Sequence, residues 1–388
     1  QFAPVIGHSK EPDAGGRTSK VMGIAEISKL YPPNFLPLEI NNDHPDRVRA
    51  LFIDSGNPME TGADSQAYRE AAKKLDLLVV IDIAMTESAE VADYVLPAST
   101  QFEKWEAAFF TFGVPDNHFH LRRPVMEPDG DTLPEPEIYR RLLVALGAIP
   151  DSLPELEEYA RSHRENPALG IFPMAFQQAM MEHPAWMPYA PIILYATLGK
   201  ALPDGAASAA VLWGTAQFFT QRYETQVRRA GYDGEGFMLA ENLFDAILNE
   251  GTAVPFSSHT YEETWDLVRH TESKIHLVID ELMTELHALA GEENHASDEF
   301  PLVLAAGERR DYNANQIMRR PDWRRTDPDG AVRIHPDDAA EAGVVDGGDG
   351  ICATRTGKIT VVVAFDAAQR RGFVSLPHGY GMEYPDMV

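Results

Sequence analysis

Cysteine is nearly absent from this sequence, since Cys352 is the single one among 388 residues. A disulfide framework is therefore impossible within the chain, and so is an iron–sulfur cluster or a zinc site held by several cysteines. Cys352 lies in an apolar stretch, where we expect a buried small side chain. A chain with so little cysteine fits a reducing compartment, and we expect a cytoplasmic location.

Basic residues are also scarce. The chain has 33 Lys and Arg against 60 Asp and Glu, which gives a formal net charge of −27 and an isoelectric point near 4.8. No nucleic-acid partner is expected, because a phosphate backbone needs a basic surface. The acidic excess indicates either an ordinary solvated surface or adaptation to high salt, and composition leaves both open.

Long apolar runs and nucleotide fingerprints are missing as well. No run of about 18 uncharged apolar residues occurs, so we expect no membrane span. The start, QFAPVIGHSK, has no methionine, basic region or apolar core of a signal peptide, and we expect the sequence to be a fragment. Neither the G-x-G-x-x-G nor the G-x-x-x-x-G-K-[ST] pattern is present.

What the sequence does contain is an alternation of strands and helices. Residues 47–55 and 76–82 are apolar runs of strand length, a helical stretch at 66–75 separates them, and another strand follows at 94–99. This spacing predicts βαβ units and a parallel sheet. Near-continuous apolar runs are typical of parallel strands, because both faces of such a sheet are covered.

The pattern changes twice further along the chain. Between about residues 150 and 289, apolar residues recur at helical three- and four-residue steps. After a polar stretch at 291–299, short β runs alternate with Gly and Asp turns and one small helix, a pattern that predicts a β barrel. We also expect a helix at 19–31 and short strands at 251–258 and 274–279.

The predicted fold class is therefore α/β. It consists of a parallel Rossmann-like sheet domain, a mainly helical middle segment and a C-terminal β-barrel domain. Length and a hydrophobic content of 44% are ample for two or three such cores. The predicted boundaries are 1–149, 150–298 and 299–388.

One apolar strand ends abruptly on Asp82, and the strand before it is followed by a Ser-Gly-Asn-Pro loop that contains Asn57. Ligands of open α/β sheets bind beyond the carboxyl ends of the strands. A carboxylate there can accept hydrogen bonds from a ribose diol or from guanine N–H groups. Lys104 follows soon after and is placed to neutralise phosphate. Alternatively, Asp82 caps the next helix, with Thr86 and Glu87 stabilising its first turn.

Two ordered blocks of motifs resemble the molybdopterin oxidoreductase family, of the dimethyl-sulfoxide-reductase type. The first block is GNP followed by DLLVVIDIAMTESAEVADYVLPASTQFEKWE. The second consists of PLVLAAGERRDYNANQIMRRPDW, VRIHPDDAAEAGVVDGGDGICATRTGKITVVV and GFVSLPHGYGMEY. The resemblance covers residues 1–147 and 300–388 well and the helical middle more weakly. It implies that the last domain is a double-psi-type barrel.

In this family the motifs build a site for molybdopterin guanine dinucleotide, and the resemblance implies which residues form it here. Asn57 matches the loop after the first strand, Asp82 the acidic residue at the guanosine end, and Lys104 the lysine of a Glu-Lys pair. Arg309 and Arg310 suit a pyrophosphate, which needs cationic forks. The predicted contacts of the last domain are Ala306, Gly307, Glu308, Arg309, Asn313, Asn315, Gln316 and His378.

Other candidates have equally good structural explanations. His118 and His120 alternate along a predicted strand, but no carboxylate pattern accompanies them, and we predict no metal site. Glu135 aligns with an acidic cofactor contact of the family or simply begins a helix. His8 lies in a Gly-rich loop that faces either a funnel or solvent. The basic cluster is a phosphate site, a solvated face or a set of salt bridges to the acidic surface: Arg309, Arg310, Arg319, Arg320, Arg324 and Arg325.

The resemblance implies an oxidoreductase that uses bis-molybdopterin guanine dinucleotide with molybdenum or tungsten on a small substrate, most like a formate dehydrogenase. It also implies an electron-transfer protein as partner. The family's iron–sulfur cluster and metal ligand belong to an N-terminal region not recognisable here, so no catalytic residue is predicted. The family's closing Asn-x-Leu-Thr segment is absent as well. The alternative is a noncatalytic subunit that keeps the fold without the cofactor, like the large iron–sulfur subunit of respiratory complex I.

Overall fold

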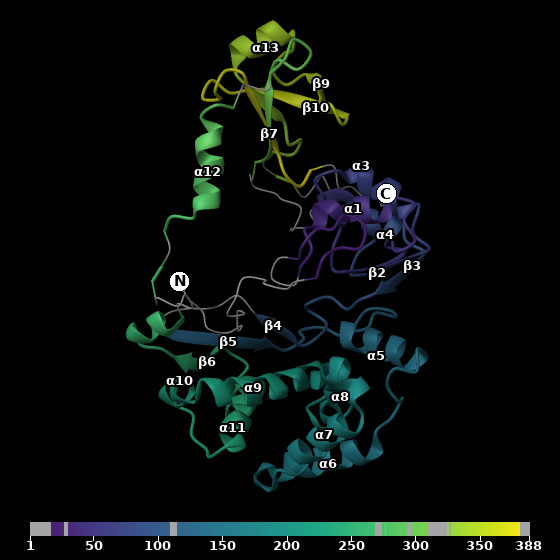
Figure 1. The fold of residues 1–388 in the computed structure, drawn as a ribbon, viewed down its shortest axis with the longest axis vertical. Helices are drawn as coiled ribbons and strands as arrows, with labels where there is room; N and C mark the ends of the chain where they lie inside the picture. The colour runs from purple at the N-terminus through teal and green to yellow at the C-terminus, as the bar shows by residue number, and fades with distance from the viewer. Residues whose placement is uncertain are drawn as a thin grey trace. The chain divides into compact units, whose positions relative to one another are not determined.

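The computed structural model describes residues 17–26, 30–108, 115–267, 274–275, 277–292, 296–308, 310, 324–325 and 327–380. Its contacts divide the chain into two compact units, Gln1–Ile275 and His276–Val388. Figure 1 shows the order of the elements along both. Within the described ranges, no helix is both long and apolar enough to cross a membrane.

A three-stranded parallel sheet opens the first unit, as the sequence predicts. Its strands lie in the order β1-β2-β3, and each neighbouring pair is parallel. Short helices connect them, because a parallel pair needs a crossover from one end of the sheet to the other. The bounds are β1 Ala50–Asp54, α2 Pro58–Thr61, α3 Ser65–Ala72, β2 Leu77–Asp82, α4 Glu87–Glu90 and β3 Tyr94–Pro97.

Both faces of β2 are buried, which explains its uninterrupted apolar sequence. Leu78 and Val80 point to one face and pack with Met59 of α2 and Tyr68 of α3. Ile81 points to the other, where it packs with side chains of α5 (Glu135–Ala145). The period of two along a strand thus assigns each β2 side chain to one of two small cores.

The helix predicted at 19–31 is wrong over its described residues. Thr18 and Ala25 form an antiparallel bridge, and the Ser19 amide donates to the Ile24 carbonyl at 2.8 Å. Gly23 adopts φ +64 between them, a left-handed conformation that glycine adopts without steric cost. The apolar spacing looks helical, but this glycine turns the chain back on itself. The short η1 (Pro33–Phe35) and α1 (Leu36–Ile40) follow.

A second, antiparallel sheet joins distant parts of the first unit. It contains β4 (Glu106–Ala108), β5 (Asp116–Arg122) and β6 (Val254–Ser258) in the order β4-β5-β6. The strand predicted at 251–258 is therefore confirmed. The one predicted at 274–279 is wrong over its described residues, where Leu277 is 90% exposed and no ladder forms.

Helices fill the region between β5 and β6, as predicted, and share one large core. Phe172 and Phe244 are fully buried there. Glu241 is buried among them and accepts hydrogen bonds from Trp213 Nε1 at 2.6 Å and Gln217 Nε2 at 3.1 Å. The elements are α6 Pro154–Glu165, η2 Pro167–Leu169, α7 Ile171–Glu182, η3 Pro184–Tyr189, α8 Ala190–Ala196, η4 Leu198–Ala201, η5 Ala206–Ala209, α9 Ala210–Arg222, α10 Glu224–Arg229, α11 Phe237–Asn249 and, after β6, η6 Glu262–Leu267.

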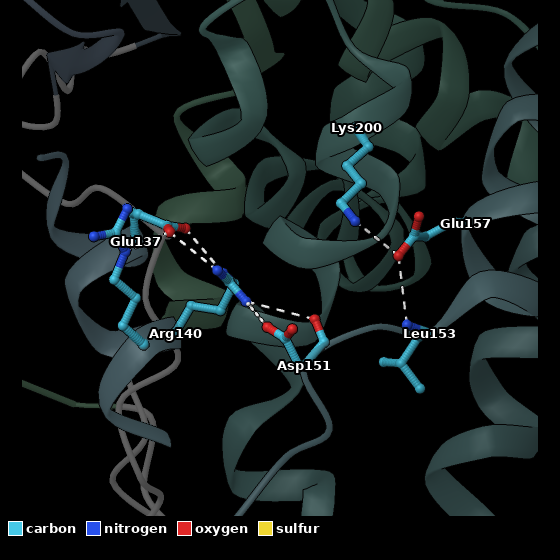
Figure 2. Close-up of polar contacts among 7 residues, drawn as sticks. Glu137, Arg140, Asp151, Leu153, Glu157 and Lys200 are labelled. Atoms are coloured by element: carbon cyan, nitrogen blue, oxygen red, sulfur yellow. Dashed lines mark hydrogen bonds and ion pairs between the residues drawn. The ribbon is translucent and has the colours of Figure 1, made fainter. Parts of the chain in front are cut away.

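Two polar links tie the helical region to itself and to α5 (Figure 2). Arg140 of α5 donates to Glu137 Oε2 and to Asp151 Oδ1, each at 2.9 Å, so that α5 holds the chain just before α6. Lys200 of η4 donates to Glu157 Oε1 of α6 at 2.8 Å. These contacts add to the packing of the shared core.

The second unit is a five-stranded mixed sheet in the order β7-β11-β8-β10-β9. β7 and β11 are parallel, as are β8 and β10, whereas β11–β8 and β10–β9 are antiparallel. A small core of Val332, Ile334, Ala339, Val363 and Val374 joins the sheet to α13. The bounds are α12 Asp280–Leu289, β7 Val303–Glu308, β8 Val332–Ile334, α13 Pro336–Ala342, β9 Asp349–Ala353, β10 Lys358–Phe365 and β11 Phe373–Pro377.

We predict that Phe244→Ala lowers the free energy of unfolding of the helical core by about 3–5 kcal/mol, because it removes buried contacts and leaves a cavity. The matched control is Phe218→Ala, since Phe218 is 77% exposed while Phe244 is 0% exposed. Urea unfolding followed by circular dichroism measures both. Equal effects of the two substitutions would contradict the described packing.

Candidate functional site

The carboxyl edge of the parallel sheet begins where β1 ends on Asp54. Ser55 follows in the left-handed region, with φ 56, and its amide donates to the Ile81 carbonyl of β2 at 2.9 Å. A left-handed serine is uncommon, and such conformations cluster at functional sites. Tyr139 of α5 donates its hydroxyl to Asp54 Oδ2 at 2.6 Å. Burial, followed by this bond, raises the pKa of Tyr139 to about 12.

Asp82 ends β2 at the same edge, one residue past the pairing of Ile81 with Asp54. Its Oδ1 accepts the amide of Ile83 at 2.7 Å, and its carbonyl accepts the amide of Ala98 at 3.0 Å. The cap of α4 is Thr86, whose hydroxyl accepts from the Ala89 amide at 3.3 Å. The helix-cap role considered for Asp82 therefore belongs to Thr86.

Asn57 lies at the same edge and connects two short helices. It precedes α2, and its Oδ1 accepts from the amide and the hydroxyl of Ser88 in α4, at 3.0 and 2.8 Å. Its Nδ2 donates to Glu87 Oε2 at 2.6 Å. Asn57 thus positions the loop after β1 against the helix after β2.

Lys104 is held by carboxylates of its own chain. Its Nζ lies 2.5 and 2.6 Å from the two oxygens of Glu135, the first residue of α5, and 3.8 Å from Glu106 Oε2. Its side chain is only 14% exposed. Two carboxylates around one ammonium leave a local charge of about −1, which offers little attraction to phosphate.

A second strand edge lies in the second unit, where β7 and β11 end side by side. Ala306 pairs with Leu376, and after a register shift Glu308 pairs with Pro377. The His378 amide then donates to the Glu308 carbonyl at 2.9 Å. Gly307 adopts φ +88 at the shift, and no described atom lies within 4 Å of where a Cβ would stand. This edge therefore brings together Ala306, Gly307, Glu308 and His378.

Tyr380 closes the described part of this edge. Its hydroxyl donates to the Asp327 carbonyl at 2.8 Å, and its ring lies 5.1 Å from the guanidinium carbon of Arg324, which is only 5% exposed. Burial, followed by the charge and bond of Asp327, raises the Tyr380 pKa to about 12. Gly330 adopts φ +58 directly beneath this ring.

The other predicted residues fall into two groups. His118 and His120 lie on β5, and Cys352 is half-buried in β9, where burial raises the pKa of its thiol. Across the described ranges, no group of three or more His, Cys, Asp or Glu side chains is arranged to hold a metal ion. Outside the described residues lie His8, Arg309, Asn313, Asn315, Gln316, Arg319 and Arg320.

Sequence reasoning missed Asp54 and its partner Tyr139. The signal for Asp54 was present, because ALFID ends an apolar strand on an aspartate as LLVVID does for Asp82. Nothing in the sequence pointed to Tyr139, which is 85 residues further along the chain.

Two family models match the chain in order. The model described as Molybdopterin oxidoreductase matches residues 15–145, and the Molydopterin dinucleotide binding domain matches residues 302–386. The chain belongs to the molybdopterin oxidoreductase family. The first candidate edge lies in the region that the first model matches, and the second candidate edge lies in the region that the second model matches.

Relatives and a solved structure agree with this membership. Acetylene hydratase of Syntrophotalea acetylenica is 24% identical over 357 residues, covering 89% of this chain and 39% of that protein. F420-dependent formate dehydrogenase 2 subunit alpha of Methanococcus maripaludis is 34% identical over 142 residues, covering 37% and 20%. The structure of acetylene hydratase from Pelobacter acetylenicus matches with a TM-score of 0.54 and 19% identity, covering 90% and 40%, which shows a shared fold. The chain spans less than half the length of these relatives.

We predict that Gly330→Ala destabilises the second unit by about 1–3 kcal/mol more than Gly343→Ala does. Both glycines have positive φ, but a Cβ on Gly330 would lie 2.4 Å from the Tyr380 ring, whereas none of the described atoms lies within 4 Å of one on Gly343. Thermal unfolding of both variants separates the contact from the shared backbone strain. Equal melting temperatures would show that Tyr380 does not pack there.

Proposed function

We propose that this chain is the cofactor-binding portion of a molybdenum or tungsten oxidoreductase that uses bis-molybdopterin guanine dinucleotide on a small substrate. The observation that carries the proposal is the ordered pair of family regions, each with a strand edge that displays polar groups. Formate is the leading substrate candidate, since several relatives are named formate dehydrogenases. When bound, the cofactor would supply the two-electron chemistry, and the protein would bind and orient it.

A guanosine suits the first edge. Asp82 ends β2 there on a carboxylate, and guanine offers N–H groups that carboxylates accept well. Asp54 ends the neighbouring strand, but the pleat turns its side chain to the other face, where Tyr139 donates to it. Ile83 and Met85, 48% and 50% exposed, provide apolar surface beside Asp82 for a flat ring or a ribose. These residues would hold a base and a sugar, whereas their charge would repel phosphate.

A pterin suits the second edge. A pterin has an amide-like rim that needs backbone and side-chain partners at close range. None of the described atoms lies within 4 Å of where a Cβ on Gly307 would stand, so the absence of a side chain there would let a flat ring approach the backbone. We infer that Ala306, Gly307 and His378 contact it, together with the predicted residues Arg309, Asn313, Asn315 and Gln316 outside the described ranges.

The finer organisation is part of the same proposal. We infer an α/β cofactor domain at 1–149, a helical segment at 150–298 and a dinucleotide-binding barrel of the double-psi type at 299–388. The enzyme would act in the cytoplasm with an electron-transfer protein. Its metal ligand and iron–sulfur cluster would be supplied by polypeptide other than these 388 residues.

A noncatalytic scaffold of the same fold is the second candidate, and one observation favours it. Lys104 is paired with Glu135, and Arg310 with Glu308 and Asp327. A protein that no longer binds a pyrophosphate would keep such internal pairs and lose exposed cations. The two candidates differ in whether the protein retains a nucleotide.

Metal and nucleotide content decide between them. We expect the full-length parent protein, from a host supplied with molybdenum and tungsten, to contain about one metal and two GMP per chain, as a metal held by two guanine dinucleotides requires. Elemental mass spectrometry and acid release of GMP measure both. Neither metal nor GMP, from a host that loads a control enzyme, would establish the scaffold candidate instead.

We predict that Asp82→Ala in the full-length protein weakens retention of the guanine dinucleotide by about 1–3 kcal/mol, because it leaves polar groups of the base unpaired. The matched control is Asp76→Ala. Asp76 lies directly before the same strand, at its opposite end, and pairs with Arg47 and Arg49. Unchanged GMP content in the Asp82 variant, or an equal loss of GMP in the control variant, would contradict the assignment of Asp82 to the guanosine.

A further inference from the structure

Arg310 is a deeply buried cation at the second strand edge. Its side chain is 6% exposed. Its Nε donates to Glu308 Oε2 at 2.9 Å, and its Nη1 donates to Asp327 Oδ2 at 3.0 Å and to the Ala331 carbonyl at 2.9 Å. A guanidinium with this geometry uses its fork on groups of its own chain, although the basic sequence around it suggested a pyrophosphate contact.

Glu308 is the centre of the same network. Its Oε2 also accepts from the Ser375 hydroxyl of β11 at 2.9 Å, and its Oε1 accepts from Arg333 Nη1 of β8 at 3.2 Å. Burial would raise the pKa of Glu308, but the bonds from Arg310 and Ser375 outweigh it and lower the pKa below its ordinary value. The carboxylate, while ionised, therefore links the end of β7 to the middle of β8 and of β11.

The charges in this network balance one another. Arg310 and Arg333 offset Glu308 and Asp327, so the group as a whole is close to neutral and offers an anion little attraction. Burying two ion pairs costs desolvation free energy, and such pairs are weak contributors to stability unless their geometry is good. What the pairs do achieve is a defined geometry between the end of β7, the chain before β8 and β8 itself.

That geometry controls the backbone of the predicted pterin contacts. Glu308 follows Gly307 directly, and its carbonyl accepts the His378 amide. The Asp327 side chain accepts a hydrogen bond from Arg310, and the Asp327 carbonyl accepts one from Tyr380. These two bonds fix the chain on both sides of the edge.

We propose that Arg310 is a positioning residue, which bridges Glu308 and Asp327 so that the ends of β7 and β11 present their backbone to the cofactor. It does not touch the cofactor itself. The inference rests on the proposed function, because it deepens the assignment of Ala306, Gly307 and His378 as contacts. It predicts that Asp327, although a carboxylate is no ligand for phosphate, is as important as Arg310 for retention of the guanine dinucleotide.

The test compares Arg310→Lys and Asp327→Asn in the full-length holoenzyme. Arg310→Lys keeps the charge but loses the fork, and Asp327→Asn removes the carboxylate that holds it. We expect each to lose the guanine dinucleotide at least about tenfold faster than the parent, measured as the fall over time in the GMP that acid releases from the protein, since charged hydrogen bonds of this kind are among the strong ones. The control is Asp337→Asn, the same change on a side chain that is 64% exposed in the same unit.

The direction in which Asp327→Asn changes retention of the dinucleotide separates a positioning role of Arg310 from direct phosphate binding. If Arg310 bound phosphate directly, removal of its competing carboxylate would leave retention unchanged or increase it, and the proposal would fall. A purely structural role would lower the melting temperature while the release rate measured well below it stayed at the parent's value, which also overturns the proposal.

Two further results keep the test decisive. Ser375→Ala removes one bond to Glu308 with little risk to folding, so a release rate equal to the parent's in that variant and in Asp327→Asn would refute the network. A parent protein that carries no GMP, from a host that loads a control enzyme, would overturn the proposed function itself. A parent with GMP but insensitive variants would overturn only the role of Arg310.

Discussion

The parallel pairing of β1 with β2 is the interaction on which the first candidate edge depends. Its register opposes Asp54 to Ile81, so that Asp82 extends one residue beyond and both carboxylates share an edge. The Ser55 amide continues the pairing past the end of β1 before the left-handed turn leads the chain away. The pleat turns Asp54 to the face of Ile81 and Asp82 to the opposite face. A slip of one residue would turn every side chain of one strand to the other face and remove β2 from the two cores that it packs against.

Charge compensation inside the chain shapes both edges. In an acidic protein, cations near a binding site face many carboxylates of their own chain, and here Lys104 and Arg310 are both committed to such partners. What the described edges offer a ligand is therefore mainly hydrogen-bond acceptors, backbone groups and apolar surface. This composition suits heterocycles and sugars better than phosphates, which need exposed cationic forks.

The helical region contributes rigidity to the same unit. Its core buries Glu241 with bonds from Trp213 and Gln217, and His163 Nε2 lies 3.1 Å from the same carboxylate oxygen. Three partners on two other helices converge on one oxygen of this buried carboxyl group, so a shift of either of these helices would lose a hydrogen bond in the core. Arg140 of α5 bonds to Asp151, just before α6, and so connects α5 to this helical region. The same helix supplies Tyr139 and Glu135 to the first edge.

The sequence alone determined the order of the elements, the parallel sheet, the strand that ends on Asp82 and the family, because apolar periodicity and motif spacing are local properties of the chain. It was wrong where one local signal competed with another, as at Gly23, whose positive φ makes a turn out of an apparent helix. Only the tertiary structure decided the partners of Lys104, Asp54 and Arg310. Ion-pair and hydrogen-bond partners depend on which segments the fold brings within about 3 Å. The separations are 17 residues for Arg310 and Asp327, 31 for Lys104 and Glu135, and 85 for Tyr139 and Asp54, and they leave no periodic trace in the sequence.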